Sequence, residues 1–183
     1  MTTTPEPDSR RVAVVTGGAG AIGSAITDAL QGNGHRTVVL DRIGEVVCDL
    51  SSEASTRAAG ATVLERFGRV IVIISDTFWS PPAPVLLPYV ASKGALLGIV
   101  RSLAVGLGPD GIAVSAVAPG LTDTPAARTV NTDEQFDATV ERQALGRRLI
   151  PEDTAAAVAF LASDGAAAMT GQVLCADGGL VLR

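Results

Sequence analysis

A β-branched run that ends in a cluster of glycines constrains the fold of this chain more than any other feature. The apolar residues Val12–Thr16 are followed by residues 17–23, which read Gly-Gly-Ala-Gly-Ala-Ile-Gly. Such a run predicts a strand that is buried on both faces of a parallel sheet. Residues 24–31 then have a helical pattern, which Gly32 and Gly34 end.

The order of strand, glycine loop and helix is the order that a pyrophosphate site requires. Glycines allow a tight turn and a close approach of the backbone to the ligand, and the start of the helix presents free N–H groups at the positive end of its dipole. A plain tight turn would also use glycines, but the flanking strand and helix supply the context of a nucleotide site. The sequence therefore predicts dinucleotide binding at residues 17–23.

Asp41 directly follows a second predicted strand, residues 37–40. A carboxylate about 20 residues beyond the glycine loop accepts hydrogen bonds from the adenosine ribose and repels a 2′-phosphate, which favours NAD over NADP. Arg42 beside it opposes this preference, because an arginine can accommodate the extra phosphate. A helix cap is the alternative role of Asp41. His35, the only histidine, precedes this strand, and we expect it to be a surface turn residue.

Tyr89 and Lys93, in the sequence Tyr-Val-Ala-Ser-Lys, form the second chemical feature. Residues four apart lie on one face of a helix, one above the other. An ammonium group held within a few ångströms stabilises a phenolate, so a tyrosine with such a neighbour can give and take a proton. The spacing alone also fits an ordinary helix with one aromatic residue and one solvated lysine.

Several segments, in the same order along the chain, resemble the short-chain dehydrogenase/reductase family. Residues 16–23 are similar to its Thr-Gly-x-x-x-Gly-x-Gly cofactor loop, with Ala21 where the middle glycine is usual. The tyrosine and the lysine match its Tyr-x-x-x-Lys motif. Residues 119–124 and 177–179 are similar to its Pro-Gly segment and its C-terminal Asp-Gly-Gly.

The resemblance implies roles for individual residues. Tyr89 is the expected general acid/base, Lys93 its partner and a ligand of the nicotinamide ribose, and Ser75 orients the substrate. Residues 49–50 resemble the pair that contacts adenine, and the Thr122 backbone and Thr124 hydroxyl are expected to bind the nicotinamide carboxamide. The cofactor-binding residues that the resemblance implies are Gly17, Ala21, Ile22, Gly23, Asp41, Asp49, Leu50, Tyr89, Lys93, Pro119, Thr122 and Thr124.

The resemblance also implies a fold, an α/β Rossmann-like doubly wound parallel sheet of about six strands. We expect one nucleotide-binding domain, residues 11–183, after a flexible tail at residues 1–10. A predicted helix ends near Phe67, and only one predicted strand lies between that point and Tyr89. The family has a further strand and helix in this interval, so the chain is one strand–helix unit shorter than the family norm. A continuous sheet would then place the tyrosine helix one strand spacing, about 4.8 Å, closer to the first strand. The absence of the helix that belongs to the missing strand–helix unit should expose an apolar face or change the oligomer.

A second departure concerns the position thirteen residues before Tyr89, where the family has a catalytic serine. Asp76 stands there, and Ser75 is one residue earlier. A hydroxyl can donate a hydrogen bond to a substrate carbonyl, and an ionised carboxylate cannot. Three explanations are open: Ser75 supplies the donor through a slipped turn, Asp76 is protonated by strong burial, or carbonyl reduction is impaired.

Two segments are candidates for the substrate region. Phe78, Trp79 and the proline-rich residues 80–84 either form the wall of an apolar pocket or make a stiff surface connection. Residues 126–149 resemble the family's mobile substrate lid, with a plain surface helix as the alternative.

Composition excludes several classes of protein. The net charge is -5 and no basic run is present, so nucleic acid is not an expected partner. No apolar run reaches membrane-spanning length and the N-terminus is polar, so we expect a cytoplasmic protein that contacts no membrane. Cys48 and Cys175 lack metal-ligand spacing, and no metal site is expected. The apolar C-terminus, residues 180–182, suggests packing against another subunit and therefore a homo-oligomer.

Two functions are consistent with these features. The first is an NAD(H)-dependent oxidoreductase that acts on a small alcohol or carbonyl, with an apolar substrate expected. The second is a shortened family member without redox chemistry, which either catalyses an elimination, isomerisation or cyclisation with Asp76 and Tyr89 or only binds a nucleotide.

Overall fold

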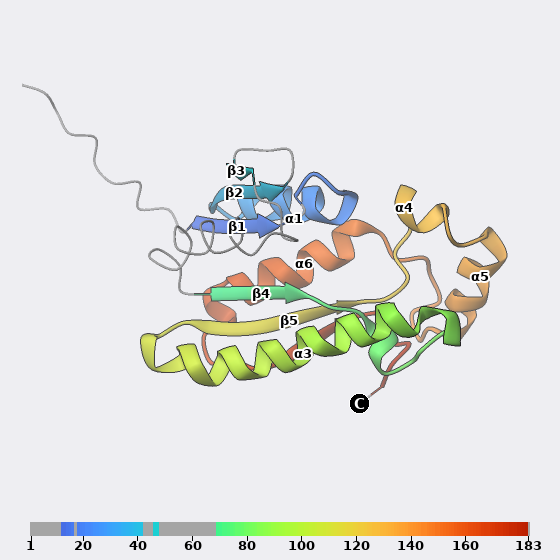
Figure 1. The fold of residues 1–183 in the computed structure, drawn as a ribbon. Coiled ribbons are helices and arrows are strands. Elements are labelled where there is room, and N and C mark those ends of the chain that lie inside the picture. The colour runs from blue at the N-terminus through green and yellow to red at the C-terminus, as the bar shows by residue number, and fades with distance from the viewer. Residues whose placement is uncertain (1–11, 17, 42–45, 48–68, 183) are drawn as a thin grey trace, which may run out of the picture.

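A computed structural model describes residues 12–16, 18–41, 46–47 and 69–182 of the chain (Figure 1). Their strands form two three-stranded parallel sheets. The first sheet consists, in spatial order, of β1 (Val12–Thr16), β2 (Arg36–Asp41) and β3 (Val46–Val47). The second consists of β4 (Arg69–Ile73), β5 (Ala113–Pro119) and β6 (Val173–Ala176).

Helices connect the strands and cover both faces of the second sheet (Figure 1). The α-helices of the described residues are α1 (Ala21–Gly32), α3 (Leu87–Leu107), α4 (Pro125–Arg128), α5 (Asp133–Arg142) and α6 (Pro151–Ala162). Short 3-10 helices are η1 (Asp76–Phe78), η2 (Pro84–Leu86), η3 (Gly108–Asp110) and η4 (Asp164–Ala166).

The central strand β5 shows why these sequences form this fold. Successive side chains of a strand point to opposite faces of the sheet, so a strand covered on both sides must be apolar throughout. Ala116 and Ala118 pack with Val100 of α3 in one buried cluster. Val117, between them, packs with Val158 of α6 in the other cluster. The predicted doubly wound α/β arrangement is therefore confirmed.

The described strands form two parallel sheets, where a single continuous sheet was also possible from the sequence. Within the described residues, β1 pairs only with β2, and β4 pairs only with β5. The two sheets are instead joined through helices, because Val15 of β1 and Val158 of α6 belong to one buried cluster, against which Ile71 and Ile73 of β4 also pack. The strand that precedes the tyrosine helix has therefore not taken a place beside β1. The expected shift of that helix by one strand position does not occur.

α3 corrects a second expectation. The segment Pro84–Asp110 is long and apolar enough to cross a membrane by length and composition, and 17% of its most apolar window is buried. Core helices of water-soluble folds pass the same test, so this is weak evidence for a membrane span. The helix buries Leu97 and Val100 and exposes Ile99 and Val105.

Some predictions fall outside the described residues. They concern the tail at residues 1–10, the helix expected up to Phe67, and the cofactor residues Gly17, Asp49 and Leu50. For Asp41 the structure describes the backbone, which ends β2 as predicted.

Candidate functional site

The candidate site lies at the carboxyl ends of the strands. All strand pairs are parallel, and β1 and β4 run in the same direction (Figure 1). The loops that follow β1, β4, β5 and β6 therefore reach one edge of the fold, which is where ligands bind in open α/β sheets. The catalytic residues predicted on two segments, after β4 and on α3, can thus serve one site.

Tyr89 and Lys93 lie one turn apart near the start of α3. The Lys93 Nζ atom donates a hydrogen bond to the carbonyl oxygen of Ile73, the last residue of β4, at 3.3 Å. The same Nζ lies 5.6 Å from the centroid of the Tyr89 ring. Tyr89 is 43% exposed, whereas burial of the half-buried Lys93 lowers its pKa. The two side chains lie together at the end of β4, with Tyr89 partly exposed and the ammonium group hydrogen-bonded to the sheet.

Ser75 is used locally to build η1. Its Oγ atom accepts hydrogen bonds from the Thr77 backbone N–H at 3.3 Å and from the Thr77 hydroxyl at 3.0 Å. Ser75 is thus the N-cap of η1 and is buried. Its own proton is directed at Oδ1 of Asp76, over a long 3.4 Å contact.

Asp76 is 4% exposed, and its pKa is raised from 3.8 to about 6. Burial is the main cause, and the charge of Asp177 adds to it, while hydrogen bonds from Ser75 and from backbone N–H groups act in the opposite direction. Asp177 follows β6 and is itself buried, with oxygens that accept the N–H groups of Gly179 and Val181 at 2.9 Å each. The strong burial that a protonated Asp76 requires is therefore present.

The start of α1 leaves backbone N–H groups without acceptors in the helix. The first helical hydrogen bond of α1 runs from the N–H of Ser24 to the oxygen of Gly20, so the N–H groups of residues 21–23 have no acceptor within the helix. A Cβ atom at Gly18 would lie 2.5 Å from Cγ1 of Val39 in β2, so a larger residue there would require this contact to shift. Ala21, in the place of the usual glycine, is exposed. Its methyl group therefore obstructs nothing among the described residues.

The segment after β5 is held by its own side chains. The Thr122 hydroxyl donates to the Gly120 oxygen at 3.0 Å, and the Thr124 Oγ atom accepts the Ala127 N–H at 3.0 Å and so caps α4. Gly120 is closely packed, because a Cβ atom there would lie 3.0 Å from Cα of Asp177. The Thr124 hydroxyl keeps its proton for a further acceptor, as the predicted carboxamide role requires.

An aromatic pair lines the same edge. The rings of Phe78 and Trp79 meet edge to face, with centroids 5.3 Å apart at 84°. The Phe78 ring lies over Gly94 of α3, where a Cβ atom would come within 2.9 Å of Cε2. Gly94 was missed in the sequence, where it looked like an ordinary helical glycine. The contact fixes the aromatic pair against the tyrosine helix.

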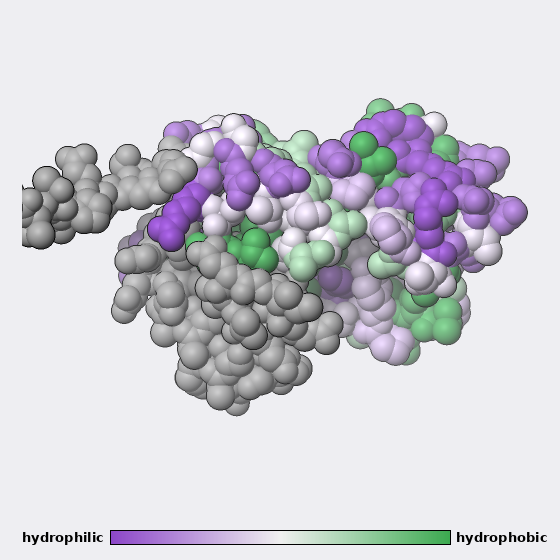
Figure 2. All heavy atoms as spheres, turned by 90° about the horizontal axis from the view of Figure 1, so that it is seen from above, coloured by the Kyte–Doolittle hydropathy of each residue, from purple (hydrophilic) through white to green (hydrophobic). Residues whose placement is uncertain are grey.

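The segment predicted to be a lid or a surface helix contains two helices, α4 and α5. Figure 2 shows hydrophilic side chains gathered at this end of the molecule. Arg148 donates to Asp133 at 2.7 Å and to Asp137 at 2.6 Å. Phe136, 2% exposed, lies near the guanidinium groups of both Arg128 and Arg148, 5.7 and 5.1 Å from its ring centroid.

Gln143, the C-cap of α5, was also missed. It is 6% exposed and packs against Gly178, next to Asp177, and its Oε1 atom has no hydrogen-bond partner within the described part of the chain. No sequence signal indicated it, because only the fold brings residues 143 and 178 together.

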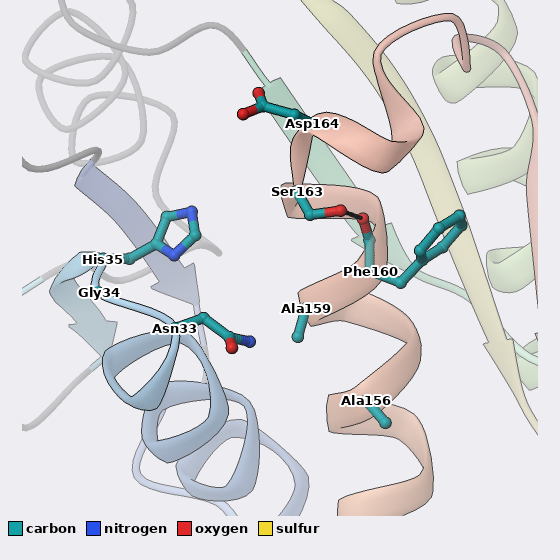
Figure 3. A pocket seen from close by; sticks show the side chains of 8 residues that line it. All are labelled: Asn33, Gly34, His35, Ala156, Ala159, Phe160, Ser163 and Asp164. Carbon is teal, nitrogen blue, oxygen red and sulfur yellow. Dashed lines mark hydrogen bonds between the residues drawn. The ribbon is translucent and has the colours of Figure 1, made fainter.

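A cavity of about 720 Å³ lies elsewhere, between the C-terminal ends of α1 and α6 (Figure 3). His35 faces it and is half-buried, with a buried Nδ1 atom that no described residue contacts by a hydrogen bond. The end of α1 leads into the start of β2, so this cavity is at the opposite edge from Tyr89. It does not belong to the candidate site.

A parallel α/β fold with a glycine loop at the first strand–helix turn defines a Rossmann-type nucleotide-binding protein. Residues 71–181 match the family model described as enoyl-(acyl carrier protein) reductase, and residues 13–74 match that of the NAD dependent epimerase/dehydratase family. The chain belongs to the short-chain dehydrogenase/reductase family.

Individual relatives agree with this assignment. The human dehydrogenase/reductase SDR family member 4 is 34% identical over 79% of this chain and 54% of its own length. The 3-oxoacyl-[acyl-carrier-protein] reductase FabG of Rickettsia prowazekii is 40% identical over 66% of this chain and 49% of its own length. The chain thus spans about half the length of these curated relatives.

Solved structures show the same fold. An actinorhodin polyketide ketoreductase variant with NADPH superposes with a TM-score of 0.80 at 26% identity, covering 95% of this chain and 98% of that one. The RhlG/NADP complex of Pseudomonas aeruginosa gives a TM-score of 0.82 at 26% identity, covering 94% and 96%.

Proposed function

We propose that the protein is an oxidoreductase that uses a nicotinamide dinucleotide to interconvert a small alcohol and the corresponding carbonyl compound. The observation that carries this proposal is the hydrogen bond from Lys93 to the end of β4, with Tyr89 one helical turn away. Both residues lie at the carboxyl-terminal edge of the strands, where ligands bind in open α/β sheets. The names of the relatives, which are reductases, support it.

The described residues would have separate roles in binding and in proton transfer. The N–H groups at the start of α1 would hold the pyrophosphate, and the Thr124 hydroxyl the carboxamide. The bound dinucleotide would supply the hydride. Tyr89 would give its phenolic proton to the substrate oxygen during reduction and take it back during oxidation, and Lys93 would stabilise the phenolate between these events. NAD is favoured by the carboxylate that ends β2, Asp41.

An apolar substrate is supported by the aromatic pair Phe78–Trp79 and by the neighbouring exposed side chains of Val85 and Leu86. A homo-oligomer is supported by α3, whose exposed face carries Ile99 and Val105. The relatives named for carbonyl reduction suggest a carbonyl compound as the first substrate to try.

Fluorescence titration with NADH and NADPH, followed by assays of their oxidation with a panel of apolar ketones and aldehydes, tests the proposal. We expect binding of one dinucleotide and turnover of at least one carbonyl compound. Tyr89→Phe should bind the cofactor equally well and lose about 10²–10⁴-fold in kcat, since it removes the proton donor. The proposal fails if neither dinucleotide binds and neither is consumed.

A second candidate function, proton transfer without redox chemistry, is favoured by one observation. A carboxyl group whose pKa is about 6, as for Asp76, can take and give a proton near neutral pH. In that function the ionised Asp76 is the base, and Asp76→Asn would abolish activity at every pH.

A further inference from the structure

We propose that the carboxylic acid of Asp76, and not the hydroxyl of Ser75, donates the hydrogen bond that polarises the substrate carbonyl. This inference rests on the proposed function. It assigns the donor role to a residue type that the family's pattern does not place there, and it makes carbonyl reduction depend on one buried proton.

Ser75 is poorly suited to be the donor. A hydroxyl has a single proton. In Ser75 that proton points to Oδ1 of Asp76, while the oxygen accepts two hydrogen bonds from Thr77. Turning the proton toward a substrate would leave the N-cap of η1 in place but would remove a hydrogen bond from the buried carboxyl group.

Asp76 is suited to be the donor because its surroundings favour the neutral acid. It is 4% exposed at the carboxyl end of β4, the same strand end that holds Lys93. The negative charge of Asp177 raises the pKa of Asp76 further. The N–H groups of Gly179 and Val181 donate their hydrogen bonds to Asp177 and not to Asp76. In its protonated form, which the raised pKa makes the major form up to about pH 6, this carboxylic acid can donate to a carbonyl oxygen, as an ionised one cannot.

The cations on the neighbouring elements are engaged elsewhere. The Lys93 ammonium from α3 binds the Ile73 carbonyl, and the Arg142 guanidinium from α5 binds the Ser80 hydroxyl at 3.1 Å. Among the described residues no ion pair to Asp76 is formed, and Tyr89 is the remaining titratable group of α3 at this edge. No cation in this part of the chain therefore compensates an ionised Asp76, and only the hydrogen bonds from Ser75 and from backbone N–H groups favour its charged form.

The reaction balances without a further reactant. In reduction, a dinucleotide held at the start of α1 would supply the hydride for the new C–H bond at the carbonyl carbon and would itself be oxidised. The electrons of the C=O π bond move to oxygen, which takes the phenolic proton of Tyr89. Asp76 keeps its proton throughout and only donates a hydrogen bond, and the Tyr89 phenolate is reprotonated from solvent.

The test is the pH dependence of kcat/KM for carbonyl reduction in the wild type, Asp76→Asn and Asp76→Ser. In the wild type we expect a decrease of about tenfold per pH unit above about 6, as the acid ionises. Both variants carry a neutral donor, so they should lack this decrease and exceed the wild type at pH 8. Asp110→Asn, the same change at an exposed carboxylate, is the matched control and should retain the wild-type profile.

Two results would overturn the proposal while leaving the proposed function intact. One is a wild-type profile that is flat from pH 5.5 to 8, and the other is loss of turnover in Asp76→Asn at every pH. A ¹³C NMR titration of labelled aspartate, with Asp76→Asn to assign the signal, gives a readout that needs no turnover. A midpoint near 4 would overturn the proposal on its own. Failure of all forms to bind or oxidise a dinucleotide would instead overturn the proposed function, and the donor role with it.

Discussion

Acidic residues are used in opposite ways at the two ends of this site. Around α5 each of Asp133 and Asp137 binds an arginine in solvent, and the Arg148 guanidinium lowers the pKa of Asp133. At the ends of β4 and β6, Asp76 and Asp177 are buried near each other, and the pKa of Asp76 is raised. The same residue type thus forms exposed ion pairs in the first region and a buried carboxyl group with a raised pKa in the second.

The physical reason is the solvent. Exposed ion pairs have little desolvation to overcome, but water and salt screen them, so they contribute little to stability. A buried carboxyl without a cation avoids the cost of burying a charge by keeping its proton. The region around α5 should therefore be robust to single changes of charge, and the end of β4 should not.

The largest expected effect concerns the apolar centre of the α5 region. Phe136→Ala should lower the free energy of unfolding by about 3–5 kcal/mol, because it empties a buried site under the arginines. Urea denaturation measures this loss. Phe160→Ala, at a side chain that is 45% exposed, is the control and should cost far less. Equal losses in the two variants would contradict a stabilising role of Phe136 beyond that of an exposed aromatic residue.

The next effect separates the two regions by pH. The pKa of Asp76 is raised in the folded state, so between pH 3.8 and about 6 the folded protein binds more protons than the unfolded chain. Stability from this group is fully present below that interval and is lost as the pH rises through it, by about 2–3 kcal/mol. Carboxyl groups with a lowered pKa, such as those of Asp133 and Asp153, act in the opposite direction, because they stabilise the folded protein less as the pH falls.

Thermal or urea unfolding of the wild type and Asp76→Asn between pH 4 and 7 measures this difference. The wild type should lose stability relative to the variant as the pH rises, and the gap should level off above pH 6. A constant difference between the two proteins would contradict a raised pKa at Asp76.

A smaller effect is expected from the second buried acid. Asp177→Asn removes the neighbouring charge but leaves Asp76 buried, so the midpoint of Asp76 should fall below about 6 and stay above 3.8. The NMR titration described above measures it. Asp123→Asn removes a carboxylate that serves Arg128 instead, and should leave the midpoint unchanged.

The smallest effect is expected from the exposed ion pairs. Arg148→Gln should lower Tm by about 1–3 °C in dilute buffer, and the difference should shrink in about 0.5 M salt, because its partners lie in water. A salt-independent loss of stability would indicate that Arg148 acts through its stacking on Phe136 and not through its charge.

Local patterns predicted the elements well. The strand Val12–Thr16, the helix that carries Tyr89 and the apolar strand β5 appear as expected, whereas α1 begins at Ala21, three residues before the predicted start of the helix. Each depends on side-chain periodicity or on backbone freedom, which neighbouring residues decide. The sequence could not predict that Phe78 rests on Gly94, or that Gln143 packs on Gly178, because these residues meet only after folding.

The sequence by itself determined the family, the order of the elements and the presence of Tyr89, Lys93 and Asp76, because motif spacing and hydrophobic pattern are properties of the chain. The tertiary structure alone decided the state of the site. It placed the strands in two sheets that α1 and α6 hold together. It also made Ser75 the N-cap of η1 and buried Asp76 where the charge of Asp177 acts on it. Burial and the charge of a residue 101 positions away set the pKa of that carboxyl, and neither can be read from its neighbours in the sequence.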